Sequence, residues 1–113
     1  MNDFSTKKLL SPPRRKLLEL MQRYSFCRIE NLAVKGGEPA FHPPPLVSED
    51  IRLGGSNGPR PELSLDDFVL RAPVIEFFEH LSRIGEGRIA LIEVRHGLPV
   101  RLVIEQPVSE EQA

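Results

Sequence analysis

Two stretches of this chain decide its fold: CRIENLAVKGGEPA at residues 27–40 and GRIALIEVRHGLPV at residues 87–100. In each stretch a run rich in β-branched residues leads to a residue pair that ends in glycine, and a proline follows two residues later. Glycine tolerates the positive φ that the second position of a two-residue hairpin turn requires. Each stretch therefore predicts two antiparallel strands joined by a tight turn, at Gly36 and Gly37 and at His96 and Gly97.

A helix-forming pattern precedes each of these stretches. Apolar residues recur at helical spacing after Pro13 and again after Pro73, and proline starts a helix more readily than it continues one. The first set is Leu17, Leu20, Met21 and Tyr24, and the second is Val74, Phe77, Phe78, Leu81 and Ile84. Helices this short are unstable alone in water, so we expect both to pack on the predicted strands.

The two helix-and-hairpin patterns lie 60 residues apart and match without a gap. Nine of the 32 positions in residues 10–41 carry the same residue as their counterparts in residues 70–101. In the first segment these positions are Leu10, Pro13, Glu19, Arg23, Arg28, Ile29, Val34, Gly37 and Pro39. The match predicts an internal repeat, with copies at residues 10–41 and 70–101 that are joined by the Pro/Gly-rich residues 42–69.

Together these patterns predict a single domain over residues 1–113 with a two-layer α+β fold. We expect duplicated helix-plus-hairpin units to form a mainly antiparallel sheet of four strands, with both helices on one face. A short strand is expected within residues 46–53, and Ser64 with Asp67 predicts an N-capped helix over residues 65–71. Residues 1–10 and 108–113 are expected to be held loosely.

Strict alternation along the second hairpin leaves apolar side chains on both faces of the sheet. The helices can cover only one face, so we expect the other to be an interface with a second copy or another protein. The candidate interface residues are Ile92, Val94, Pro99 and Val103. The alternatives are a bulge that changes the facing of the strand, or coverage by residues 42–69.

The net charge of −1 hides an uneven distribution, since residues 1–48 hold eight Lys or Arg against four acids and residues 49–113 hold seven against twelve. Basic residues near the first helix suggest nucleic-acid binding as an alternative function. These candidates are Lys7, Lys8, Arg14, Arg15, Lys16, Arg23 and Arg28. The same charges could instead attract the acidic half of a second copy, or solvate the start of a helix.

The residues needed for catalysis or metal binding are scattered. His42, His80 and His96 fall in different predicted elements, and Cys27, the single cysteine, has no histidine near it in the sequence. We therefore expect no enzyme, no cofactor and no metal site, and Cys27 is predicted to be a small buried residue. No apolar run approaches the roughly 18 residues of a membrane span, so a cytoplasmic protein is expected.

Residues 17–41 resemble the YezD-like family of short uncharacterised bacterial proteins through Leu18-Glu19, Phe26-Cys27, Ile29-Glu30 and Gly36-Gly37. Proteins of that family look like a single unit of one helix followed by one hairpin. Their aromatic-glycine pair before the first strand falls on Phe26-Cys27 and on Glu86-Gly87, so each half keeps one member of it. The resemblance implies a fold and a bacterial source but no activity. The functional prediction is a non-enzymatic module that self-associates, as a homodimer, or binds another protein.

Overall fold

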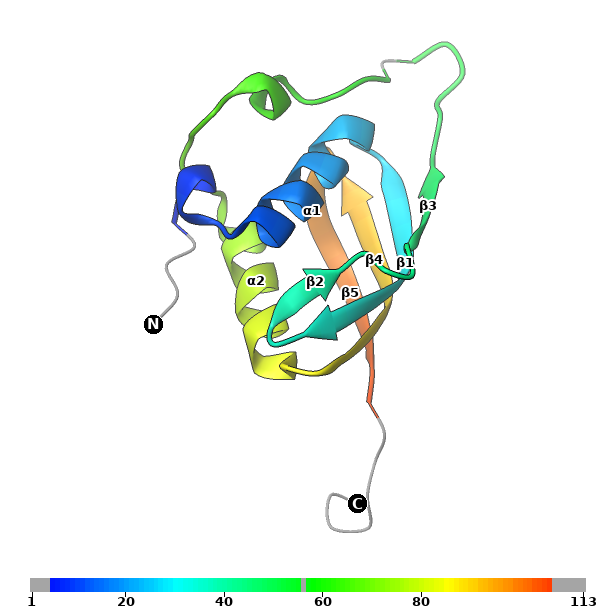
Figure 1. Ribbon diagram of the computed structural model, residues 1–113. Helices are drawn as coiled ribbons and strands as arrows, with labels where there is room; N and C mark the ends of the chain where they lie inside the picture. The colour runs from blue at the N-terminus through cyan, green and yellow to red at the C-terminus, as the bar shows by residue number, and fades with distance from the viewer. Residues whose placement is uncertain (1–4, 56, 107–113) are drawn as a thin grey trace.

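The computed structural model describes residues 5–55 and 57–106. Within that part the fold is α+β, with two α-helices and a five-stranded antiparallel sheet (Figure 1). The helices are α1 (Pro12–Tyr24) and α2 (Ala72–Ile84), and 3-10 turns lie at η1 (Lys7–Leu9) and η2 (Pro61–Ser64). The strands are β1 (Cys27–Lys35), β2 (Glu38–Ala40), β3 (Leu46–Glu49), β4 (Gly87–Arg95) and β5 (Leu98–Glu105). The predicted α+β class is confirmed, and the short strand expected within residues 46–53 is β3, which joins the four hairpin strands as the fifth strand of the sheet.

Both helices begin at a proline-containing turn, as predicted, and both end on a residue with positive φ. Ser25 follows α1 with a φ of 56°, and Gly85 follows α2 with a φ of 65°. Their N–H groups donate to the carbonyls of Met21 and Leu81, each four residues back. This conformation stops the helix and turns the chain into the following strand.

The strands follow the order β2-β1-β4-β5, and β3 pairs with the same side of β1 as β2, farther along the strand (Figure 1). In the central pair, Cys27 lies opposite Val94 and Val34 lies opposite Gly87. Cys27 and Gly87 are counterparts 60 residues apart, and so are Val34 and Val94. Each pair therefore joins the same two matched positions, one from each copy. The register of β1 with β4 is therefore symmetric with respect to that match.

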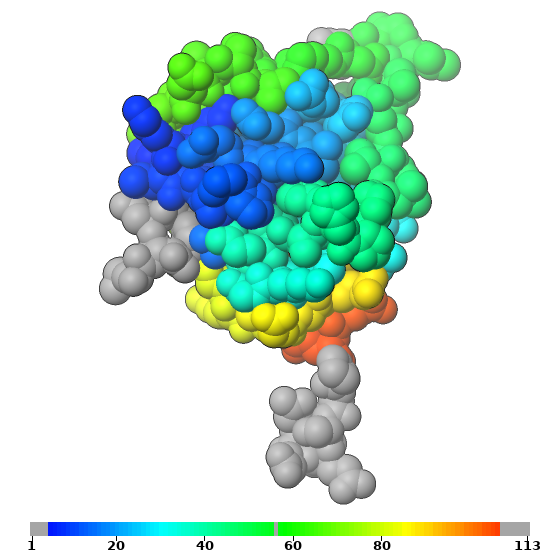
Figure 2. Space-filling view, in the orientation of Figure 1, coloured from blue at the N-terminus to red at the C-terminus, as the bar shows by residue number. Residues whose placement is uncertain are grey.

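The tip of each hairpin contacts the end of the helix from the other half. The N–H of Gly97 donates to the carbonyl of Ser25 at 2.8 Å, and the N–H of Gly37 donates to the carbonyl of Gly85 at 2.8 Å. Figure 2 shows the first hairpin tip, in cyan, against the yellow end of α2. Each half thus satisfies a backbone group that the other half leaves open.

One hydrophobic core draws on both helices and on the two central strands. Its fully buried members are Leu17, Leu18, Met21, Ile29, Leu32, Val34, Phe78, Leu81, Ile89, Ile92 and Val94. Two of the predicted interface residues, Ile92 and Val94, are 0% and 2% exposed, so their prediction as interface residues is wrong. The reason is a bulge at Ala90, where the register of β4 with β5 shifts by one residue. The inward-facing residues are therefore Ile89 and then Ile92, three positions later, instead of Leu91.

The segment before α2 also differs from its prediction. Residues 65–71 are not a helix; Val69 forms a bridge with Thr6, and Leu70 donates from its N–H to the carbonyl of Ser5 at 2.9 Å. Leu10 is 3% exposed, so residues 5–10 are held firmly rather than loosely. The expectation for residues 1–4 and 108–113 lies outside the described residues. Pairing between the two segments replaces the local hydrogen bonds that a helix would have supplied.

Candidate functional site

The open edge of β5 is the most distinctive exposed backbone feature of the sheet. β5 pairs with β4 along one side, and none of the strands formed by residues 5–55 and 57–106 pairs with its other side. It is eight residues long and contains one proline, Pro99, near its start. A strand edge of this kind presents unpaired N–H and C=O groups that can hydrogen bond to another extended chain.

A groove of about 500 Å³ runs beside this edge, between β5 and α2. Its surface is mainly apolar. Residues of α2 that line it are Pro73, Glu76, Phe77 and His80, and residues of β5 are Pro99, Val100, Arg101, Leu102 and Ile104. Val100 is 54% exposed. The groove and the open edge together form a site to which a strand could bind with its side chains partly enclosed.

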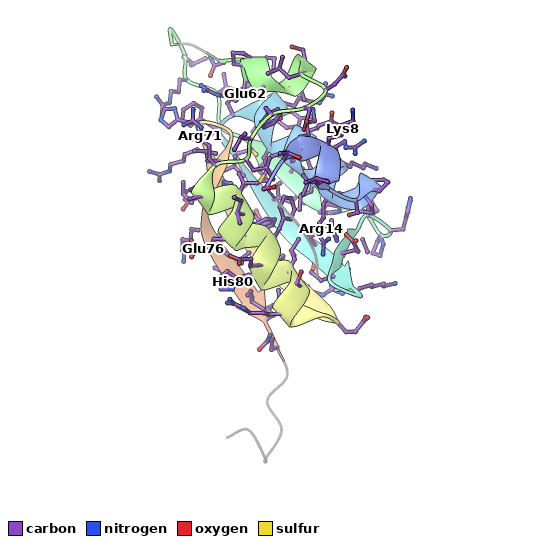
Figure 3. All side chains as sticks on the ribbon, turned by 90° about the vertical axis from the view of Figure 1, so that its left-hand side faces the viewer. Lys8, Arg14, Glu62, Arg71, Glu76 and His80 are labelled. Atoms are coloured by element: carbon purple, nitrogen blue, oxygen red, sulfur yellow. The ribbon has the colours of Figure 1, made fainter. Side chains whose placement is uncertain are left out.

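Polar groups lie at the helical side of the groove. Glu76 and His80 are one helical turn apart on α2 and project from the same side of it (Figure 3). Arg101 contributes a third charged or titratable group from the strand. An apolar floor with a few polar groups on its rim is typical of protein interaction sites.

The two remaining predicted interface residues lie near this site. Pro99 is buried and lines the groove, whereas Val103 is half-buried on the opposite face of β5. Leu102, Ile104 and the residues of α2 were not among the predicted interface residues. One signal was available: the first hairpin is followed by prolines at positions 43–45, whereas residues 100–106 contain none. A strand without proline keeps all its N–H groups available for pairing.

The basic residues proposed as nucleic-acid contacts are not all accessible. Lys7 is 2% exposed, and its Nζ donates to the carbonyl of Leu65 at 2.8 Å and lies 3.1 Å from Oε2 of Glu19. Arg14 is 5% exposed and donates to the carbonyl of Gly37 at 3.0 Å. The prediction that Lys7 and Arg14 contact nucleic acid is therefore wrong, because both cations are buried in structural roles.

The other members of the basic set remain at the surface. Arg15 is half-buried and donates to the carbonyls of Lys8 and Leu10 at 3.2 and 3.3 Å. The exposed members are Lys8, Lys16, Arg23 and Arg28. Lys16 and Arg23 belong to α1, Arg28 to β1 and Lys8 to η1. Phosphate binding would have to rely on these four exposed cations, with Arg15 committed to the backbone.

Cys27 is buried, at 3% exposure, as predicted. Burial raises the pKa of its thiol from 9.0 to about 11, with a smaller contribution from the charge of Glu49. A thiol with this pKa stays protonated at neutral pH and is a poor nucleophile. Within residues 5–55 and 57–106, no three His, Cys, Asp or Glu side chains are grouped as a metal site would require.

A second depression of about 530 Å³ lies at the start of β1 and is lined by charges of both signs. Its charged residues are Arg28, Glu49, Asp50, Arg52, Glu93 and Arg95. The guanidinium of Arg52 stacks 4.1 Å from the ring of Phe26, and His96 meets the same ring edge-on at 4.8 Å. Because both acids and bases line this depression, the arrangement suggests no single ligand charge.

In the part of the chain that the structure describes, neither helix has the length and apolar character needed to cross a membrane. Comparison of the chain with protein-family models, with curated proteins and with solved structures gave no significant match.

Proposed function

We propose that this domain is a non-enzymatic interaction module that binds an extended polypeptide segment at the open edge of β5. The segment pairs with β5 through backbone hydrogen bonds, and alternate side chains of it enter the groove beside α2. In strand addition of this type, the backbone bonds supply affinity and the side-chain pockets supply specificity. The observation that carries the proposal is that an eight-residue strand edge, with which no strand of residues 5–55 and 57–106 pairs, lies beside an apolar groove.

We also propose that residues 10–41 and 70–101 are two copies of one ancestral unit of the YezD-like type, arranged with both helices on the same face of the sheet. The reciprocal hydrogen bonds from Gly37 to Gly85 and from Gly97 to Ser25 support this proposal. Replacing each residue by its counterpart 60 residues away turns one bond into the other. The symmetric register of β1 with β4 supports the proposal as well. In this account, duplication creates two hairpins, and within the described residues the second keeps a long edge with which no other strand pairs.

Selection of peptides on the purified domain tests strand addition with no partner specified in advance. A random nonapeptide phage library is panned on the wild type and counter-selected on Val103→Lys, since lysine on an edge strand opposes pairing. Leu46→Lys, which makes the same type of change on β3 at the other edge of the sheet, is the control. We expect enriched peptides to alternate apolar and polar residues and to bind the control as well as they bind the wild type.

Amide hydrogen exchange locates the bound peptide. The proposal predicts that an enriched peptide slows exchange in β5 and leaves β3 unchanged, because only backbone groups that gain a partner are protected. Enrichment that is equal on wild type and Val103→Lys, or protection outside β5 and α2, would contradict it. A labelled oligonucleotide at low ionic strength serves as the alternative ligand: we expect no binding, and binding that Lys16→Glu weakens would favour the nucleic-acid function instead.

A further inference from the structure

We infer that the natural occupant of the β5 edge is the β5 strand of a second copy of this chain. This inference rests on the proposed function, because it uses the same edge. The two β5 strands run antiparallel about a two-fold axis that passes through Val103, and the two sheets join into one. The groove beside α2 then adjoins its symmetry mate across the axis.

The charges along β5 are arranged for this pairing. Arg101 lies two residues before Val103 and Glu105 lies two residues after it. With Val103 opposite itself, Arg101 of each copy faces Glu105 of the other, which gives two opposite-charge pairs for one strand contact. Opposite charges placed directly across an antiparallel pair stabilise it, and like charges destabilise it.

The apolar residues fit the same register. Leu102 lies opposite Ile104 of the second copy, and both residues line the groove. Arg101, Val103 and Glu105 alternate with them and therefore project from the other face of the strand, with Arg101 also reaching the rim of the groove. Moving the axis to Leu102 or to Ile104 leaves the same side chains facing each way but places Arg101 or Glu105 opposite Val103. Neither charge then faces an opposite charge of the second copy. The register centred on Val103 alone satisfies both the charges and the apolar face.

Sedimentation velocity over a range from micromolar to sub-millimolar chain tests the dimer and its register together. We expect the wild type to dimerise and Val103→Lys to be monomeric, whereas Leu46→Lys dimerises like the wild type. Arg101→Glu and Glu105→Arg each place like charges at both pairs, and we expect each to raise the dissociation constant about tenfold or more at low salt.

The mixture of these two variants is the decisive measurement. Arg101→Glu presents two acids and Glu105→Arg presents two bases, so the mixture should form a heterodimer although neither variant dimerises well alone. The double variant R101E with E105R should dimerise as the wild type does. Since Arg101 and Glu105 lie opposite Glu93 and Arg88 on β4, thermal unfolding of each variant checks that its own fold is intact. Should a single exchange fail to fold, Arg101→Gln and Glu105→Gln replace it.

The outcomes separate the inference from the proposed function. If the wild type is monomeric throughout the range while selected peptides still bind β5, the inference that a second copy occupies the edge is wrong, and the proposal of strand addition is retained. A dimer that Val103→Lys disrupts but whose charge variants do not pair in the mixture overturns the register. Failure of both dimerisation and peptide binding overturns the proposed function as well.

Discussion

The two hairpins of this protein start alike and end differently. β1 and β4 are each nine residues long and lead into a two-residue turn, at Gly36 and Gly37 or at His96 and Gly97. β2 then stops after three residues, whereas β5 continues for eight. Prolines at positions 43–45 interrupt the first edge, because proline cannot donate to a strand ladder, and β3 resumes the pairing beyond them.

The difference assigns different roles to the two edges of the sheet. The β2 and β3 edge is short, broken and rich in proline, which are devices that discourage association of strands. The β5 edge has one proline and a bulge at Val100 near its start and is regular from Arg101 to Glu105. Under the proposed function, local sequence after the turn, rather than the turn itself, decides which hairpin accepts another chain.

The largest expected effect tests whether the two halves contribute equally to the core. Ile29 and Ile89 occupy matched positions in β1 and β4, and both are 0% exposed. We expect Ile29→Ala and Ile89→Ala each to lower the free energy of unfolding by about 3 kcal/mol, through lost burial and the cavity left behind. Urea denaturation measures both. A cost several times larger for one variant would show that the halves are not equivalent in the core.

A smaller effect concerns a position at which the halves differ. Arg14 is buried and donates to Gly37 and, at 3.3 Å, to Oγ of Ser82, whereas its counterpart is Val74. We expect Arg14→Val to cost about 2 kcal/mol, because the hydrogen bonds to a charged donor are lost and Glu38 loses its ion-pair partner. Thermal and urea unfolding measure the loss. Stability equal to that of the wild type would mean that Arg14 contributes nothing beyond what valine supplies.

The turn glycines sharpen the comparison further. A Cβ added at Gly37, where φ is 74°, would lie 3.3 Å from Cα of Ser82 on α2, while one added at Gly36 would meet nothing within 4 Å. Both substitutions strain the backbone, and His96 shows that a side chain can occupy the first turn position, with a φ of 54°. We expect Gly37→Ala to be less stable than Gly36→Ala by about 1 kcal/mol in chemical denaturation. The reverse order would argue against close packing of the hairpin tip on α2.

The smallest expected effect concerns the pH dependence of stability at Cys27, whose counterpart in the second half is Gly87. Burial raises the pKa of the thiol to about 11 from 9.0, so the folded chain keeps a proton that the unfolded chain loses first. The resulting stability is complete below pH 9 and is lost as the pH rises through 11. We expect the difference in unfolding free energy between wild type and Cys27→Ala to fall across this range. A constant difference would place the thiol in contact with water.

Several features of the fold were predictable because they depend on neighbouring residues. Helices start at the turns that contain Pro13 and Pro73 and end before the strands, and both two-residue turns fall at the predicted glycines. The helix expected over residues 65–71 was wrong because Thr6 and Ser5 supply hydrogen bonds from a distant segment. Of the four residues predicted to form an interface, Ile92 and Val94 lie in the core because of the bulge, whereas Pro99 and Val103 lie on β5, where the contact is proposed.

The sequence by itself determined the α+β class, the positions of the helices and turns, and the apolar residues available for a core, since periodicity and the backbone limits of glycine and proline act over a few residues. Only the tertiary structure decided which faces those residues occupy and that Lys7 and Arg14 are buried. It also decided that β5 has an edge beside α2 with which no other strand of the described residues pairs. One extra residue in a strand reverses its facing, and a strand edge is free or paired according to segments far away in the chain. Such properties belong to the assembled sheet and cannot be read from any single stretch.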